Sequence, residues 1–286
     1  MVSDMSFVEQ LRERAEKTGN IISFGFDPVV EKIPSKKQSV KETIVAFNRE
    51  LLDAFVSEGI EPALAKPNGA FYEQYGFEGL QALKVVIEDC HARGIPVLLD
   101  VKRGDIGKTS EAYAKAVFGF WEADALTVAP YMGNDSVGPF LEYCSKGKGV
   151  YILVRTSNKG AVDVQNLDVK GVPVYRKVAE HLVRGWHVPG AGAVVGATYP
   201  AELEELSAFF VGSGKQVPLL IPGVGAQGGS AADVVGTLRK TGNPLWMHRI
   251  NSSSGISYAY EKEKTTDYVG AAVRAMKELK KEIGGY

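Results

Sequence analysis

The sequence predicts an α/β fold, a closed (β/α)8 or TIM barrel of parallel strands. Eight short apolar runs alternate with amphipathic segments along the 286 residues. Strands that alternate with helices pair in parallel through βαβ units. A single barrel of this kind typically takes about 250 residues, which suits the chain's length. A doubly wound open sheet is the alternative, because one sequence does not determine the number of strands.

The predicted elements run from one end of the chain to the other. The strands are expected at residues 21–27, 63–66, 96–102, 125–129, 149–155, 192–197, 217–222 and 245–251. A helix at residues 5–18 precedes the first strand, and the whole chain, residues 1–286, is expected to form one barrel domain. The amphipathic segments at 40–59 and 76–94 each end in glycine, as helices often do. Residues 156–171 form the longest predicted loop, a candidate lid or binding loop.

Composition limits the classes of partner. The formal net charge is −1, so neither nucleic acid nor an anionic membrane is expected as a partner. No stretch approaches the roughly 20 apolar residues of a membrane span. Cys90 and Cys144 lie far apart and the four histidines show no metal-ligand spacing. We therefore expect a cytoplasmic protein with buried thiols and no bound metal.

Polar residues follow several of the predicted strands. Asp27 ends the first strand and Lys66 the second, and Ser157 follows the fifth. A glycine-rich turn follows the seventh strand, and Asn251 with three serines follows the eighth. The C-terminal ends of barrel strands meet at one mouth, where the active sites of such barrels lie.

The densest charge lies after the third predicted strand. Asp100 and Lys102 are two apart, so a strand places them on the same side. Asp105 and Thr109 are four apart and are expected to open the next helix on one face. A salt-bridged strand end with Asp105 as the helix N-cap is the alternative. Lys66 favours a site, because an alternating Lys–Asp–Lys–Asp array keeps each partly buried charge beside an opposite one.

The glycine-rich turn at residues 222–229, PGVGAQGG, is a candidate phosphate site. Glycines let backbone N–H groups approach a phosphate at a helix N-terminus. An ordinary strand-to-helix turn is the alternative reading. Barrel phosphate sites frequently follow strands seven and eight, which favours the functional reading.

Five motifs in order resemble the orotidine 5′-phosphate decarboxylases, in the longer, bacterial-type branch of that family. They are KPNGAFYE at 66–73, DVKRGDI at 100–106, VAPYMG at 128–133, TSNKG at 156–160 and PGVGAQGG at 222–229. The resemblance implies conversion of orotidine 5′-phosphate to UMP and CO2 in de novo pyrimidine biosynthesis, without a metal or organic cofactor. It also implies a homodimer with shared active sites.

The resemblance assigns roles to individual residues. Lys66, Asp100, Lys102 and Asp105 match the catalytic tetrad, in which the last aspartate comes from the partner subunit. The residues that match substrate contacts are Asp27, Ile106, Thr109, Pro130, Ser157, Pro222, Gly225, Gln227, Gly228 and Ser254. Of these, Asp27 matches a ribose contact, Ser157 a pyrimidine contact, and Gln227 part of the phosphate grip.

One position departs from the family pattern. Ser254 stands where the family carries an arginine that clamps the phosphate. Arg249, Lys159 and Arg155 are the candidate substitutes, Arg249 first.

Two other functions stay open at this point. One is a magnesium-dependent sugar-phosphate lyase of the same suprafamily, such as a hexulose phosphate synthase. The other is a non-catalytic nucleotide-binding relative.

Overall fold

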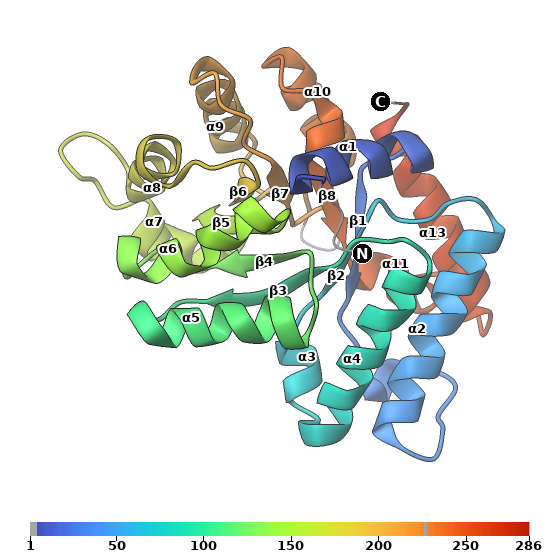
Figure 1. Cartoon of the computed structure of the whole chain (residues 1–286). Helices are drawn as coiled ribbons and strands as arrows, with labels where there is room; N and C mark the ends of the chain where they lie inside the picture. Colours follow the sequence, from blue (N-terminus) through green and yellow to red (C-terminus); the bar gives the residue numbers. More distant parts are fainter. Residues whose placement is uncertain (1–4, 226–227, 286) are drawn as a thin grey trace.

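The computed structural model describes residues 5–225 and 228–285, and its centre is a barrel of eight parallel strands (Figure 1). The strands are β1 Ile22–Phe26, β2 Leu64–Pro67, β3 Leu98–Arg103, β4 Ala125–Val128, β5 Gly149–Arg155, β6 Ala191–Val195, β7 Leu219–Ile221 and β8 Arg249–Ser252. Their order is β2-β1-β8-β7-β6-β5-β4-β3. Parallel bridges from Ala65 to Val97 and from Asn68 to Asp100 join the two ends of this order. The predicted barrel is confirmed, and the open sheet is excluded.

Helices surround the barrel (Figure 1). The α-helices are α1 Phe7–Thr18, α2 Val40–Ser57, α3 Ala70–Glu73, α4 Gly76–Ala92, α5 Gly107–Lys115, α6 Asn134–Leu141, α7 Val162–Gln165, α8 Val174–His181, α9 Pro200–Gly212, α10 Ala231–Lys240, α11 Ser254–Ser257, α12 Ala259–Glu263 and α13 Tyr268–Ile283. The shorter helical turns are η1 Val30–Lys32, η2 Ala116–Phe120, η3 Glu142–Lys146, η4 Lys159–Ala161, η5 Leu182–Trp186 and η6 Leu245–Met247. In the described part of the chain, none of these helices has both the length and the apolar character that a membrane crossing needs.

Helix α1 closes the N-terminal end of the barrel. It begins behind Ser6, whose hydroxyl accepts from Glu9 N while Glu9 accepts from Ser6 N, a capping box. Phe7 and Leu11 pack among the side chains of the barrel interior, including Tyr151. The rings of Phe7 and Tyr151 meet edge to face at 6.0 Å. With this end filled, the opposite end remains for a ligand.

The structure corrects three of the predicted local features. Residues 245–247 form η6, so β8 begins only at Arg249. The loop at 156–171 contains η4 and α7, and Gln165 ties it back by accepting from Thr156 N at 2.9 Å. Helix α5 begins at Gly107 with Ile106 at its N-cap, so Asp105 is neither the N-cap nor on a helical face with Thr109. The reason is the backbone at Gly107, whose φ of 46° turns the chain sharply after Asp105.

We expect the stability of the fold to fall on mild acidification because of His248. Its ring is fully buried, and Nδ1 accepts from Leu219 N at 3.0 Å. Burial, with help from Arg249, lowers the pKa of His248 to about 3. The unfolded chain takes up this proton near pH 6.5, so stability is lost as the pH falls below that value, by about 2 kcal/mol between pH 7 and 5. Urea unfolding at both pH values measures this loss.

His248→Asn is the comparison for that experiment, since its Oδ1 can accept from Leu219 N and does not titrate. The variant should lose less stability than the wild type between pH 7 and 5. Equal losses in the two proteins would contradict the role of His248.

Candidate active site

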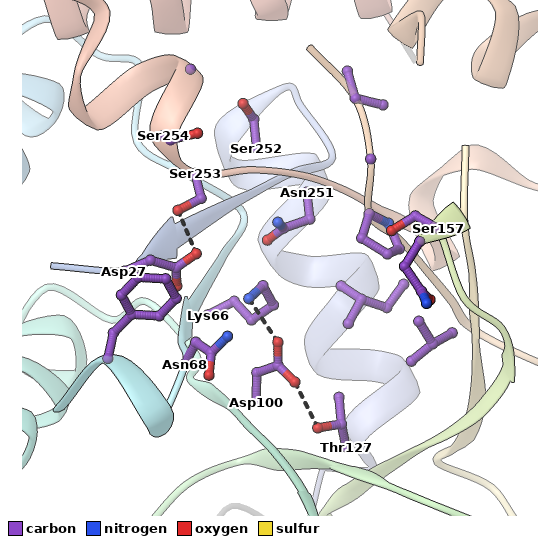
Figure 2. A pocket seen from close by; sticks show the side chains of 18 of the residues that line it. Asp27, Lys66, Asn68, Asp100, Thr127, Ser157, Asn251, Ser252, Ser253 and Ser254 are labelled. Atoms are coloured by element: carbon purple, nitrogen blue, oxygen red, sulfur yellow. Dashed lines mark hydrogen bonds and ion pairs between the residues drawn. The ribbon is translucent and has the colours of Figure 1, made fainter. Parts of the chain in front are cut away.

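A pocket of about 680 Å³ lies at the C-terminal end of the barrel. Its lining includes Asp27, Val29, Lys32, Lys66, Asn68, Phe71, Asp100, Lys102, Thr127, Leu153, Thr156, Ser157, Asn158, Val194, Leu220, Pro222, Gly223, Val224, Asn251, Ser252, Ser253, Ser254, Gly255 and Tyr258. Figure 2 shows side chains from opposite sides of the barrel converging on this space. The pocket therefore lies where the sequence predicts a site, at the mouth formed by the strand ends.

An alternating chain of charges forms the pocket wall next to β2 and β3. Lys66 Nζ lies 3.0 Å from Asp100 Oδ2, and Lys102 Nζ lies 2.7 Å from Asp100 Oδ1. Lys66 and Asp100 are only 4% and 8% exposed. Burial alone would raise the pKa of Asp100, but Lys66 and Lys102 outweigh it and hold that pKa well below its ordinary value. Burial lowers the pKa of Lys66, but Asp100 and then Asp27 more than offset this and raise it. At neutral pH the carboxylate of Asp100 therefore lies ionised between two ammonium groups.

Asp27 presents a second carboxylate to the pocket from the end of β1. Its Oδ2 accepts from Ser253 Oγ at 2.6 Å (Figure 2). Its Oδ1 is buried and has no hydrogen-bond partner among the described residues. Tyr258 supports this turn, because its hydroxyl accepts from Val29 N at 2.7 Å. Asp27 therefore contributes an anchored carboxylate to the pocket lining.

The structure brings only some of the predicted site residues together. Those that line the pocket are Asp27, Lys66, Asp100, Lys102, Ser157, Pro222 and Ser254. Those outside its lining are Asp105, Ile106, Thr109, Pro130, Gly225 and Gly228. Gln227 lies outside the described residues. Asp105, Ile106 and Thr109 follow the end of β3, and Ile106 is 54% exposed, so within one chain these side chains do not complete the site.

Several lining residues were not predicted from the sequence. Asn68 follows Lys66 by two residues, and strand alternation could have placed it on the same side. Thr127 lies one residue from the end of β4 and could have been found in the same way. Lys32 lies in η1, a short turn that has no comparable sequence signal.

Two of the candidate phosphate cations are ruled out by their positions. Arg249 is fully buried at the N-terminal end of β8, and its Nη2 donates to Leu11 O of α1 at 2.6 Å. Arg155 is also fully buried, with Nε 2.9 Å from Glu202 and its guanidinium 3.8 Å from the centre of the Tyr199 ring. Arg249, the first candidate to substitute for the family's arginine, therefore does not reach the pocket.

Two lysines remain to be placed. Lys159 is exposed and does not line the pocket. Lys32 does line it and pairs with Glu261 at 2.8 Å. Lys32 is thus the cation that shares the pocket with Ser254 but lies outside the chain of charges around Asp100.

No set of three or more His, Cys, Asp or Glu side chains within residues 5–225 and 228–285 is grouped to hold a metal ion. The polar groups of the pocket are instead ammonium groups, carboxylates, hydroxyls and amides. Such a set suits a polar, anionic organic ligand. Its negative charge can pair with the lysines, and its hydroxyl groups can donate hydrogen bonds to Asp27.

Comparison with known proteins agrees with this geometry. Residues 42–265 match the family described as "Orotidine 5'-phosphate decarboxylase / HUMPS family". The orotidine 5′-phosphate decarboxylase of Halorubrum lacusprofundi is 41% identical over 290 residues, covering 99% of this chain and 100% of that protein. The protein of the same name from Cupriavidus metallidurans is 41% identical over 283 residues, covering 99% of each chain.

A solved structure extends the likeness to three dimensions. The OMP decarboxylase of Leishmania donovani is 34% identical and superposes with a TM-score of 0.76, covering 98% of this chain and 99% of that one. The match of the family to most of the chain and the full-length likeness to curated relatives lead to one conclusion. The chain belongs to the orotidine 5′-phosphate decarboxylase family.

Proposed function

We propose that the protein is an orotidine 5′-phosphate decarboxylase, a carboxy-lyase that forms UMP and CO2 in de novo pyrimidine biosynthesis without a cofactor. The observation that carries the proposal is the Lys66–Asp100–Lys102 chain of charges in the pocket. The names of its full-length relatives support the same activity.

The charges match what this reaction needs. When the bond from C6 to the carboxylate breaks, CO2 leaves and C6 keeps the electron pair in an orbital that lies in the ring plane. The ring cannot delocalise this pair well. The Lys102 ammonium stabilises the carbanion electrostatically and then transfers a proton from Nζ to C6. Lys66 keeps Asp100 ionised, and Asp27 accepts from the ribose.

We also propose a homodimer whose active sites each use residues of both subunits. Asp105, Ile106 and Thr109 would reach the site of the partner subunit. An apolar surface beside them supports this, since Tyr131 is 91% and Met132 44% exposed. The two segments are adjacent, because Ala129 N donates to Arg103 O at 2.8 Å.

We further propose that the barrel is the chain's one domain and that the protein works in the cytoplasm. Cys90 and Cys144 are both buried free thiols, as is usual in a reducing compartment.

The test of the function is the loss of absorbance of orotidine 5′-phosphate with purified protein and EDTA. We expect turnover of orotidine 5′-phosphate at a rate that EDTA leaves unchanged. Turnover of a sugar phosphate that EDTA abolishes would favour the magnesium-dependent lyase. UMP binding with no turnover of either substrate would favour the non-catalytic relative.

We expect Ser254→Arg to raise kcat/KM for orotidine 5′-phosphate by about tenfold or more. A charged hydrogen bond contributes roughly 1.5–3 kcal/mol, and an arginine can make two to one phosphate. Binding energy from the remote phosphate also helps organise the reacting end of the substrate. Steady-state kinetics with orotidine 5′-phosphate and with orotidine, which lacks the phosphate, measure the effect, and turnover of orotidine should stay unaltered.

Ser254→Gln, long but neutral, is the matched control and should not give the gain. If Ser254→Arg is neutral or harmful, either another cation already holds the phosphate or Ser254 does not occupy the position of the family's arginine. Lys32 is then the residue to replace next, because it shares the pocket with Ser254.

A further inference from the structure

The backbone at Lys102 is in an unusual conformation. Its φ is 43°, in the left-handed region that side-chain-bearing residues rarely adopt. The register between β3 and β4 shifts at the same place, between Leu99 and Arg103. Strain of this kind persists only where the surroundings over-determine it. Some neighbouring group must therefore hold the chain at Lys102.

That group is the hydroxyl of Thr127 on β4. Thr127 is 1% exposed, and its Oγ1 accepts from Val101 N at 3.1 Å and from Lys102 N at 2.9 Å. The same hydroxyl donates to Asp100 Oδ1 at 2.9 Å (Figure 2). A hydroxyl has one proton to donate and two lone pairs. All three are used, and all three are directed to residues 100–102.

The network links the backbone of Lys102 to its side chain. Asp100 Oδ1, which accepts from Thr127, also lies 2.7 Å from Lys102 Nζ. The Thr127 hydroxyl thus orients two groups. One is the Asp100 carboxylate, which holds the Lys102 ammonium, and the other is the backbone of Lys102 itself. On the next two strands, the lining side chains Leu153 and Val194 are apolar and offer no such hydroxyl.

We propose that Thr127 is a positioning residue, whose hydroxyl holds Lys102 in its left-handed conformation and directs its ammonium into the pocket. This inference rests on the proposed function, since it concerns how that function's proton donor is placed. Without the hydroxyl, the N–H groups of Val101 and Lys102 lose their acceptor and Asp100 loses a donor. The backbone can then relax and carry the ammonium away from C6. A displacement of about 1 Å can lower a rate about a hundredfold.

The test compares Thr127→Val, which keeps the shape and removes the hydroxyl, with Thr127→Ser, which keeps the hydroxyl. We expect Thr127→Val to lower kcat for orotidine 5′-phosphate about a hundredfold. Its Kd for UMP, measured by titration calorimetry, should stay within about threefold, because the proton and both lone pairs of the Thr127 hydroxyl are already used by residues 100–102. Thr127→Ser should recover kcat to within about fivefold of the wild type. If Thr127→Val does not fold, Thr127→Ala against Thr127→Ser gives the same comparison of hydroxyl and no hydroxyl.

Thr43→Val is the matched control. Thr43 is also buried, and its hydroxyl accepts from Lys37 N at 2.9 Å and donates to Ser39 O at 2.9 Å, but it does not line the pocket. This change should leave kcat unaltered.

The inference is overturned if Thr127→Val keeps kcat within about fivefold, or if Thr127→Ser loses as much as Thr127→Val. It is also overturned if UMP binding falls in parallel with kcat, which would indicate a general loss of structure. An inactive wild type contradicts the proposed function itself. An active wild type with an equally active Thr127→Val contradicts this inference alone.

Discussion

Replacing Lys102 with alanine is expected to lower kcat for orotidine 5′-phosphate by at least about a thousandfold. In the proposed mechanism, the change removes the cation that stabilises the carbanion and the acid that protonates it, and each contributes roughly a hundredfold or more. It also removes the ammonium 2.7 Å from Asp100 Oδ1, which leaves Lys66 as the ammonium paired with that carboxylate. Steady-state decarboxylation rates measure the effect.

Lys240→Ala is the control for that loss. Lys240 lies on α10, its side chain is 67% exposed, and it pairs with Glu204 away from the pocket. Its removal should leave kcat unchanged. Thermal unfolding of both variants separates lost chemistry from lost folding. A folded Lys102→Ala enzyme within tenfold of the wild type would rule out Lys102 as the acid.

Mixing two inactive variants is expected to restore activity. If Asp105 acts in the partner's site, Lys102→Ala and Asp105→Ala subunits form heterodimers with one doubly defective site and one intact site. Random exchange makes about half of the dimers mixed, so about a quarter of the wild-type activity should return. Co-purification of differently tagged subunits demonstrates that the subunits have exchanged. The decarboxylation activity of the mixture is then measured.

The control pair is Lys102→Ala with Asp100→Ala. These two residues are in contact within one chain, so every site of a mixed dimer lacks one of them and no activity should return. If the Asp105 mixture also stays inactive although exchange is shown, the site lies within a single chain.

Much of the fold could be predicted from local sequence pattern. The apolar runs located the strands, and the amphipathic segments with terminal glycines located two of the helices. Both patterns arise because strands and helices bury apolar side chains in the barrel. The same pattern placed Asp27, Lys66, Asp100 and Lys102 at the barrel mouth, where the structure has them. Strand direction and side-chain alternation suffice for that, since all parallel strands present their C-terminal ends to one face.

The candidate phosphate cations show where local pattern fails. Arg249 was the first candidate for the phosphate cation, and its strand was predicted to begin at residue 245. The strand begins at Arg249 instead, which puts the guanidinium at the opposite end of the barrel, against Leu11 O. A boundary error of four residues thus moves a side chain from one end of a short strand to the other. Such boundaries depend on how η6 packs below the strand and not on residue preference alone.

What the sequence determined by itself is the barrel, the charged residues at its mouth and their order along the chain. Only the tertiary structure decided how Lys102 is held, because its left-handed backbone and the three hydrogen bonds of Thr127 depend on the register between β3 and β4. Thr127 is 25 residues from Lys102 in sequence. Contacts between strands arise from packing across the barrel, and no local period encodes them.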